Sequence, residues 1–187
     1  MGGRSGGGAS GGMGSGSAVG ATEIGMSKAM AKSVVNAENS IRGNDFETLF
    51  TFDDNGNIVY SEKGGKKSVR FYGQKTVDAV VTHNHPSGSA FSGADLKNAV
   101  KFNQKEIRAT GKEFTFSMKR PAGGWGKSPL TVSRKFNQYH KEASAQYYKL
   151  KTGDAALDRK IWIKLSTNVS SKVAHDFGWI FTVKKNK

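Results

Sequence analysis

Apolar and polar side chains alternate between residues 46 and 72, and this pattern predicts a β-meander. From Phe46 to Phe52, aromatic residues on one face alternate with other residues on the opposite face. The segment Asp53–Asn57 contains an Asn-Gly pair, which tolerates the positive φ angles of a tight hairpin turn. We therefore expect strands at residues 46–52, 58–60 and 68–72.

Later segments alternate between strand and helix patterns. Val77–Thr82 is short and mostly apolar, which is typical of a strand buried on both faces. After Asp154, apolar residues recur every four positions along one helix face: Leu157, Ile161, Leu165, Val169 and Val173. The other expected elements are helices at 23–42, 92–103 and 129–151 and strands at 107–110, 114–118 and 179–183. This order predicts an α/β (α+β) fold, with helices flanking a mixed sheet and a helical C-terminal part.

The N-terminal end has a different composition. Residues 1–25 contain 11 of the 24 glycines, and residues 1–22 carry one charged side chain, Arg4. Such a segment buries too little apolar surface to offset the entropy of ordering it, so we expect a disordered tail at 1–22. It lacks the basic start and apolar block of a signal peptide, and no apolar run approaches the length of a membrane helix. We expect a protein that no signal peptide directs to secretion and that has no membrane partner.

The net charge of +14 is concentrated in the second half of the chain. Residues 1–96 carry 9 basic and 9 acidic side chains, whereas residues 97–187 carry 20 basic and 6 acidic ones. A basic half is typical both of contact with polyanions and of a solvated surface. The residues that we expect to meet a nucleic acid or an acidic partner are Lys135, Lys141, Lys149, Lys151, Lys160 and Lys164.

One cluster of residues carries the chemistry of a metal site. His83 and His85 follow the predicted buried strand, and side chains at i and i+2 of an extended segment point to the same side. Asp95 falls in the first turn of the next predicted helix. Since the chain has no cysteine, disulfides and Cys-ligated zinc are excluded. A His/His/Asp set with an open fourth position for water is the arrangement of a catalytic zinc site, so we expect Zn²⁺.

A water molecule on zinc needs a base to take its proton. Three upstream glutamates are candidates: Glu38, Glu47 and Glu62. Glu47 is the strongest, because it lies in the predicted first strand on the face opposite Phe46, Phe50 and Phe52. Glu62 lies near a solvent-exposed turn, and Glu38 would serve only if its helix crosses the sheet.

The segment His83–Gly88, His-Asn-His-Pro-Ser-Gly, together with Ser92-x-x-Asp95, resembles the JAMM signature of the JAB/MPN metalloprotease superfamily, nearest to its RadC-like branch. The resemblance covers residues 46–118. It implies a zinc hydrolase that cleaves a peptide or isopeptide bond. By position it also implies Glu47 as general base, His83, His85 and Asp95 as ligands, and Ser92 as a helper that stabilises the oxyanion. The expected organisation is a JAB-like metal-site domain at 23–120 with a basic helical extension at 121–187 packed on it.

A looser resemblance links the chain to C-terminal domains of phage head-morphogenesis proteins. In these, a similar His-Asn-His-Pro motif is followed by an Arg-Pro and Gly-Trp stretch, here Arg120-Pro121 and Gly124-Trp125. Such domains are suspected toxins or effectors. This resemblance implies a location in the bacterial cytoplasm or in the phage particle. The expected partner, a protein or peptide substrate, is implied by the JAB/MPN resemblance.

Two other functions stay open. The basic second half favours a metal-dependent nuclease toxin that uses the same cluster. Nine residues separate His85 from Asp95, one fewer than is usual in the family, which favours a non-catalytic, DNA-associated particle protein. In that case Ser92 and Asp95 form only a capping box, and Pro86-Ser87-Gly88 only a turn.

Overall fold

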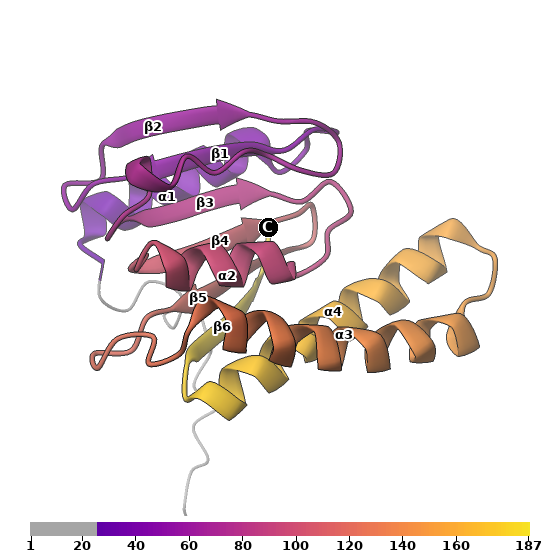
Figure 1. Cartoon of the computed structure of the whole chain (residues 1–187). Helices are drawn as coiled ribbons and strands as arrows, with labels where there is room; N and C mark the ends of the chain where they lie inside the picture. The colour runs from indigo at the N-terminus through magenta and orange to yellow at the C-terminus, as the bar shows by residue number, and fades with distance from the viewer. Residues whose placement is uncertain (1–25) are drawn as a thin grey trace, which may run out of the picture.

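Six strands form one mixed sheet in the computed structural model, which describes residues 26–187 (Figure 1). The strand order is β2-β1-β3-β4-β5-β6, and only β3 and β4 pair in parallel. The strands are β1 (Thr48–Phe52), β2 (Ile58–Lys63), β3 (Val80–Asn84), β4 (Glu106–Thr110), β5 (Phe114–Lys119) and β6 (Ile180–Lys185). With four helices around this sheet, the predicted α+β class is confirmed. The expected tail at 1–22 lies outside the described residues.

Helices cover both faces of the sheet (Figure 1). They are α1 (Lys28–Ile41), α2 (Gly93–Lys101), α3 (Pro129–Leu150) and α4 (Ala155–Phe177), with a short 3-10 turn, η2 (Gly73–Lys75). On one face α1 packs Val34 against Phe52 and Val80. On the other face α2, α3 and α4 enclose the largest core cluster, in which Leu96 meets Ile107. Because β6 pairs with β5, the C-terminal part is both packed on the sheet and continuous with it.

The parallel pair β3–β4 requires a crossover, and α2 supplies it. The chain leaves the carboxyl end of β3 and enters the N-terminus of α2 at the same edge of the sheet (Figure 1). Ser92 caps this helix, as predicted, by accepting a hydrogen bond from the amide of Asp95. In open sheets, ligands bind where strands end at such crossovers.

Two predicted strands differ from the structure. The prediction of a strand at 68–72 is wrong, because Ser68–Tyr72 is a loop. This loop lies over one face of the sheet, where Val69 and Phe71 pack in one cluster with Leu49 and Val81. Exposed and more buried side chains therefore alternate along this segment, as predicted, but its backbone does not pair with a strand of the sheet. The strand predicted at 77–82 begins only at Val80, because Asp78 adopts a positive φ of 50° that breaks the extended chain.

Helices α3 and α4 form a long antiparallel hairpin that extends past the sheet on the side toward which β3 points (Figure 1). Three of the five residues predicted for the buried face of α4 are buried, namely Leu165, Val169 and Val173. Leu157 is 49% exposed because it lies on the projecting end, where no core is available. Gly178 ends α4 in the left-handed conformation, which glycine adopts without steric cost. No helix within residues 26–187 is both long and apolar enough to cross a membrane.

The face under α1 holds a buried charged network. The guanidinium group of Arg108 on β4 forms ion pairs with Glu38 of α1, at 2.6 Å, and with Glu106, at 2.7 Å. Thr82 donates a hydrogen bond to Glu38, and Ser117 donates one to Glu106. This network connects α1 to the three central strands of the sheet.

Candidate metal centre

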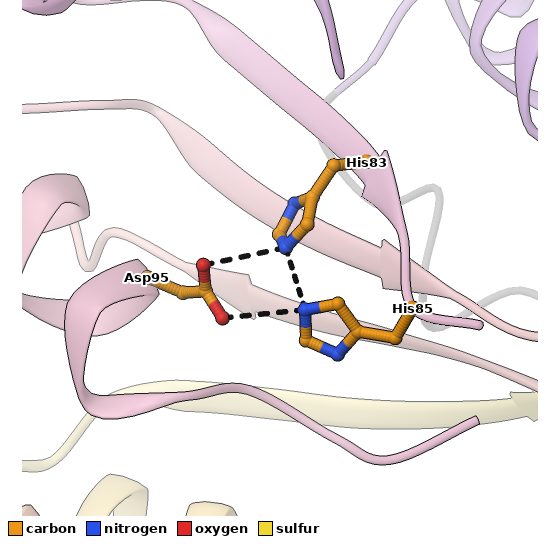
Figure 2. Close-up of side chains that lie close together, drawn as sticks. All are labelled: His83, His85 and Asp95. Atoms are coloured by element: carbon orange, nitrogen blue, oxygen red, sulfur yellow. Dashed lines mark hydrogen bonds and ion pairs between the residues drawn. The ribbon is translucent and has the colours of Figure 1, made fainter. Parts of the chain in front are cut away.

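His83 and His85 project toward one point beyond the end of β3 (Figure 2). His83 is the fourth residue of the strand and is fully buried, and His85 immediately follows the strand end and is 8% exposed. The extended backbone places both imidazoles on one side, as the i, i+2 spacing predicts. Their Nε2 atoms lie 2.9 Å apart.

Asp95 joins the two imidazoles from the first turn of α2 (Figure 2). Its Oδ1 lies 3.3 Å from Nε2 of His83, and its Oδ2 lies 3.5 Å from Nε2 of His85. At a zinc–nitrogen distance of about 2.05 Å, the donor atoms of a tetrahedral site lie roughly 3.3 Å apart. The three side chains thus have the geometry to hold a metal ion, and the nine-residue spacing between His85 and Asp95 does not separate them.

The capping box of α2 fixes the position of Asp95. Its Oδ2 accepts a hydrogen bond of 2.7 Å from the amide of Ser92, while the Ser92 hydroxyl accepts one from the Asp95 amide at 3.2 Å. The sequence offers the capping box and the metal cluster as alternatives, but the geometry allows the Asp95 carboxylate to form the cap and also to lie within the cluster that could hold a metal ion. The hydroxyl hydrogen of Ser92 is not used in the cap.

The outer nitrogen of His85 is fixed by a backbone group. Nδ1 of His85 lies 2.9 Å from the carbonyl oxygen of Ser89, which only accepts hydrogen bonds, so Nδ1 carries a proton. Nε2 is therefore the atom whose lone pair would bind a metal. In metal-binding histidines, the other ring nitrogen typically donates a hydrogen bond to a carbonyl or carboxylate, as Nδ1 of His85 does here. Nδ1 of His83 has no partner within the described residues, and its ring packs edge-on against Phe71.

Glu47 lines a cavity of about 480 Å³, which we call the metal cavity. His85, Asp95 and Ser92 line it too. Glu47 lies two residues before Leu49, the register partner of His83, and so faces the same side of the sheet. Burial raises the pKa of the Glu47 carboxyl above its ordinary value, and the nearby imidazoles only partly oppose this shift. Neither alternative base lines this cavity: Glu38 is engaged with Arg108 under the opposite face, and Glu62 accepts a hydrogen bond from Tyr60 on β2.

Asn84 is a contributor that sequence reasoning missed. Its side chain is fully buried, and it points away from the two histidines that flank it in the sequence. Its amide nitrogen donates to the carbonyl of Phe46 at 2.8 Å, and its amide oxygen accepts from the amide of Thr48 at 2.6 Å. These two bonds clamp the backbone on either side of Glu47 to the strand that carries the ligands.

The basic residues predicted to meet an acidic partner do not line the metal cavity. Lys135 forms an ion pair with Asp176 at 3.1 Å, and Lys160 and Lys164 line a different cavity against Phe114 and Val183. Lys141, Lys149 and Lys151 lie farther along α3 and at its end. Among the described residues, the lysines that do line the metal cavity are Lys66 and Lys67, which directly precede the Ser68–Tyr72 loop.

Comparisons of the chain with protein-family models, curated proteins and solved structures found no match.

The site should make the stability of the metal-free protein depend on pH. Burial alone would lower the pKa of His85, but Asp95 outweighs it and raises this pKa to about 9. The imidazoles likewise overcome burial and hold the pKa of Asp95 well below its usual range. Because an unfolded histidine has a pKa of about 6.5, the stabilisation from the His85 proton is complete below that pH and disappears as pH rises to about 9.

As the pH rises from 6.5 to 9, we therefore expect the thermal unfolding midpoint of the metal-free protein, measured in EDTA, to decrease relative to the midpoint of a His85→Gln variant. Affinity for a divalent metal ion should rise over the same interval, because a metal bound at Nε2 must displace this proton. A difference between the two midpoints that stays constant across this range would contradict the prediction.

Proposed function

We propose that this protein is a zinc-dependent hydrolase of the JAB type that cleaves a peptide or isopeptide bond. The observation that carries the proposal is the convergence of His83, His85 and Asp95 beside a cavity that Glu47 also lines. The resemblance of the His-Asn-His-Pro-Ser-Gly segment to the JAMM signature supports the same conclusion.

The donor set favours zinc. Two imidazole nitrogens and one carboxylate oxygen are ligands that zinc accepts, and three protein ligands leave one tetrahedral position open. Calcium and magnesium prefer sites made wholly of oxygen atoms, which this cluster does not supply. When bound, zinc would supply Lewis-acid polarisation and lower the pKa of water.

The residues around the open position have complementary roles. The Glu47 carboxylate takes a proton from the attacking water as the new C–O bond forms, and then gives this proton to the amine nitrogen as the C–N bond breaks. Its raised pKa suits both transfers, because a base works best when its pKa approaches the working pH. The Ser92 hydroxyl donates a hydrogen bond to the oxyanion at the carbonyl carbon.

Metal analysis tests the cofactor directly. Protein purified from zinc-supplemented medium should contain one zinc ion per chain, and His83→Ala should lose at least 90% of it, because two ligands rarely retain zinc. His175→Ala is the matched control, since the His175 side chain is 90% exposed and lies away from the site. Elemental analysis of both proteins measures the outcome. Zinc-free wild-type protein, or equal zinc in wild type and His83→Ala, would contradict the proposed centre.

Hydrolysis is then tested on a mixed pool of peptides analysed by mass spectrometry. Cleavage that chelators abolish and zinc restores is the expected result.

A metal-dependent nuclease is the second candidate, because Lys66 and Lys67 line the metal cavity and would attract a phosphate group. Plasmid and RNA degradation that disappears in His83→Ala, without peptide cleavage, would favour it. The non-catalytic alternative, a DNA-associated particle protein, predicts that DNA binding persists in that variant and weakens steeply with salt.

A further inference from the structure

A second cavity, of about 220 Å³, lies between residues 89–93 and the α3–α4 hairpin, and we call it the hairpin groove. Ser89 and Ser92 line both this groove and the metal cavity. The two hollows therefore lie on either side of one short segment, which leads from the metal ligand His85 to the helix that carries Asp95. A chain bound at the metal can continue into the groove.

Aromatic rings make one wall of the groove. Phe136 lies at its base against Gly93, so closely that a β-carbon at this glycine would lie 2.9 Å from the ring. The His140 ring stacks on Phe136 at 5.7 Å and meets the Trp162 ring edge-on at 5.5 Å. His140 is exposed and Trp162 is only partly buried, so both rings present surface to the groove. Large, partly exposed aromatic rings in a concave site are typical anchors for a bound partner.

The groove and the metal cavity differ in charge. Among residues 26–187, no lysine, arginine, aspartate or glutamate lines the groove, whereas Lys66 and Lys67 line the metal cavity. A phosphodiester chain would therefore meet no lysine or arginine of the described chain in the groove. Its aromatic wall suits an uncharged apolar group, with serine and asparagine side chains around it. The volume corresponds to roughly seven water molecules, enough for one large side chain.

We propose that the hairpin groove binds an apolar or aromatic side chain of the peptide that is cleaved in the metal cavity. This inference rests on the proposed hydrolase function and adds a substrate preference to it. Ser89 and Ser92 each line both hollows, so a single chain segment separates the two, and layers packed on one another lie about 10 Å apart. Since an extended peptide covers about 3.3 Å per residue, the recognised side chain lies within about three residues of the bond that is cut.

Binding is tested without turnover by NMR titration of the zinc-loaded protein with small amides. N-acetyl-L-phenylalaninamide and N-acetyl-L-leucinamide should shift the Trp162 indole signal and the amide signals of residues 89–93, whereas N-acetylglycinamide should not. Trp162→Ala and His140→Ala should each weaken binding at least tenfold. The matched control is Tyr148→Ala, which removes a 68% exposed ring from the same hairpin, outside the groove.

Equal binding of all three amides, or unchanged affinity in both groove variants, would overturn the proposal. If thymidine monophosphate shifts the signals of the Trp162 indole and of residues 89–93 at lower concentration than the amides do, the peptide proposal would be overturned in favour of a nucleic acid.

Cleavage of the peptide pool separates this proposal from the function on which it rests. Wild-type protein should favour apolar residues at one fixed position within about three residues of the cut, and Trp162→Ala should lose that preference while it still cleaves. Cleavage without a positional preference would contradict the proposed role of the hairpin groove, but not the proposed hydrolase function. Selective amide binding without any zinc-dependent cleavage contradicts the hydrolase, and with it the role of the groove in substrate recognition.

Discussion

Replacement of Glu47 by glutamine is expected to lower the rate of peptide cleavage by about 100- to 10,000-fold, the usual contribution of a general base. The amide keeps the size of the carboxylate but cannot take a proton from water. Zinc content should stay at the wild-type level, because Glu47 is not one of the three residues that could hold the metal ion. Steady-state kinetics on one cleaved peptide, with elemental analysis of the same samples, measures both quantities.

Glu62→Gln is the control for this prediction, because Glu62 is a carboxylate of the adjoining strand β2 that does not line the metal cavity. It should cleave at the wild-type rate. A zinc-loaded Glu47→Gln protein that retains more than a tenth of the wild-type rate would show that Glu47 is not the base. In the wild type, the acid limb of the pH–rate profile should lie above the ordinary glutamate pKa, because burial raises the pKa of this carboxyl.

Replacement of Arg108 by methionine should cost about 3–5 kcal/mol of folding free energy, as expected when one member of a buried ion pair is removed. The guanidinium group forms ion pairs with both Glu38 and Glu106, and both carboxylates are almost fully buried. Without it, two buried carboxylates would lose their charged partner. Chemical denaturation monitored by circular dichroism measures the loss.

The exposed residue Arg134 provides the control Arg134→Met, which should change stability by less than about 0.5 kcal/mol. The triple variant Glu38→Leu, Glu106→Leu and Arg108→Met should recover much of the lost stability, because well-packed apolar groups often replace a buried charged network without loss. An Arg108→Met protein as stable as the wild type would contradict the role assigned to the network.

Local patterns were sufficient to predict most elements of this fold. The strands predicted at 46–52 and 114–118 and the cap at Ser92 depend on neighbouring residues, and the structure contains β1, β5 and the cap, although β5 is buried on both faces. Ser68–Tyr72 was predicted wrongly because alternating burial is the same for a paired strand and for an extended loop lying on a sheet. Only the long-range contacts of Val69 and Phe71 distinguish the two cases. The sequence places Leu157 on the apolar face of α4, but it does not show that the hairpin leaves the core at that point, where Leu157 is exposed.

The candidate metal site has a local part and a long-range part. The histidine pair follows from the two-residue spacing, and the position of Asp95 follows from the capping box, so both were accessible from the sequence. The clamp formed by Asn84 joins residues 36 and 38 positions apart and depends on the pairing of β1 with β3. The hairpin groove likewise requires α3 and α4 to lie beside residues 89–93, which no short motif specifies.

The length of the α3–α4 hairpin determines how far its basic end can exert an electrostatic influence. Lys149 lies 13 residues beyond Phe136 on α3, which corresponds to about 20 Å along the helix axis. At physiological ionic strength the Debye length is about 8 Å, so the cations at the far end of the hairpin are screened from the metal cavity. A polyanion bound at that end and a substrate held beside His85 would therefore respond independently to salt. Added electrolyte would release the first without weakening capture of the second.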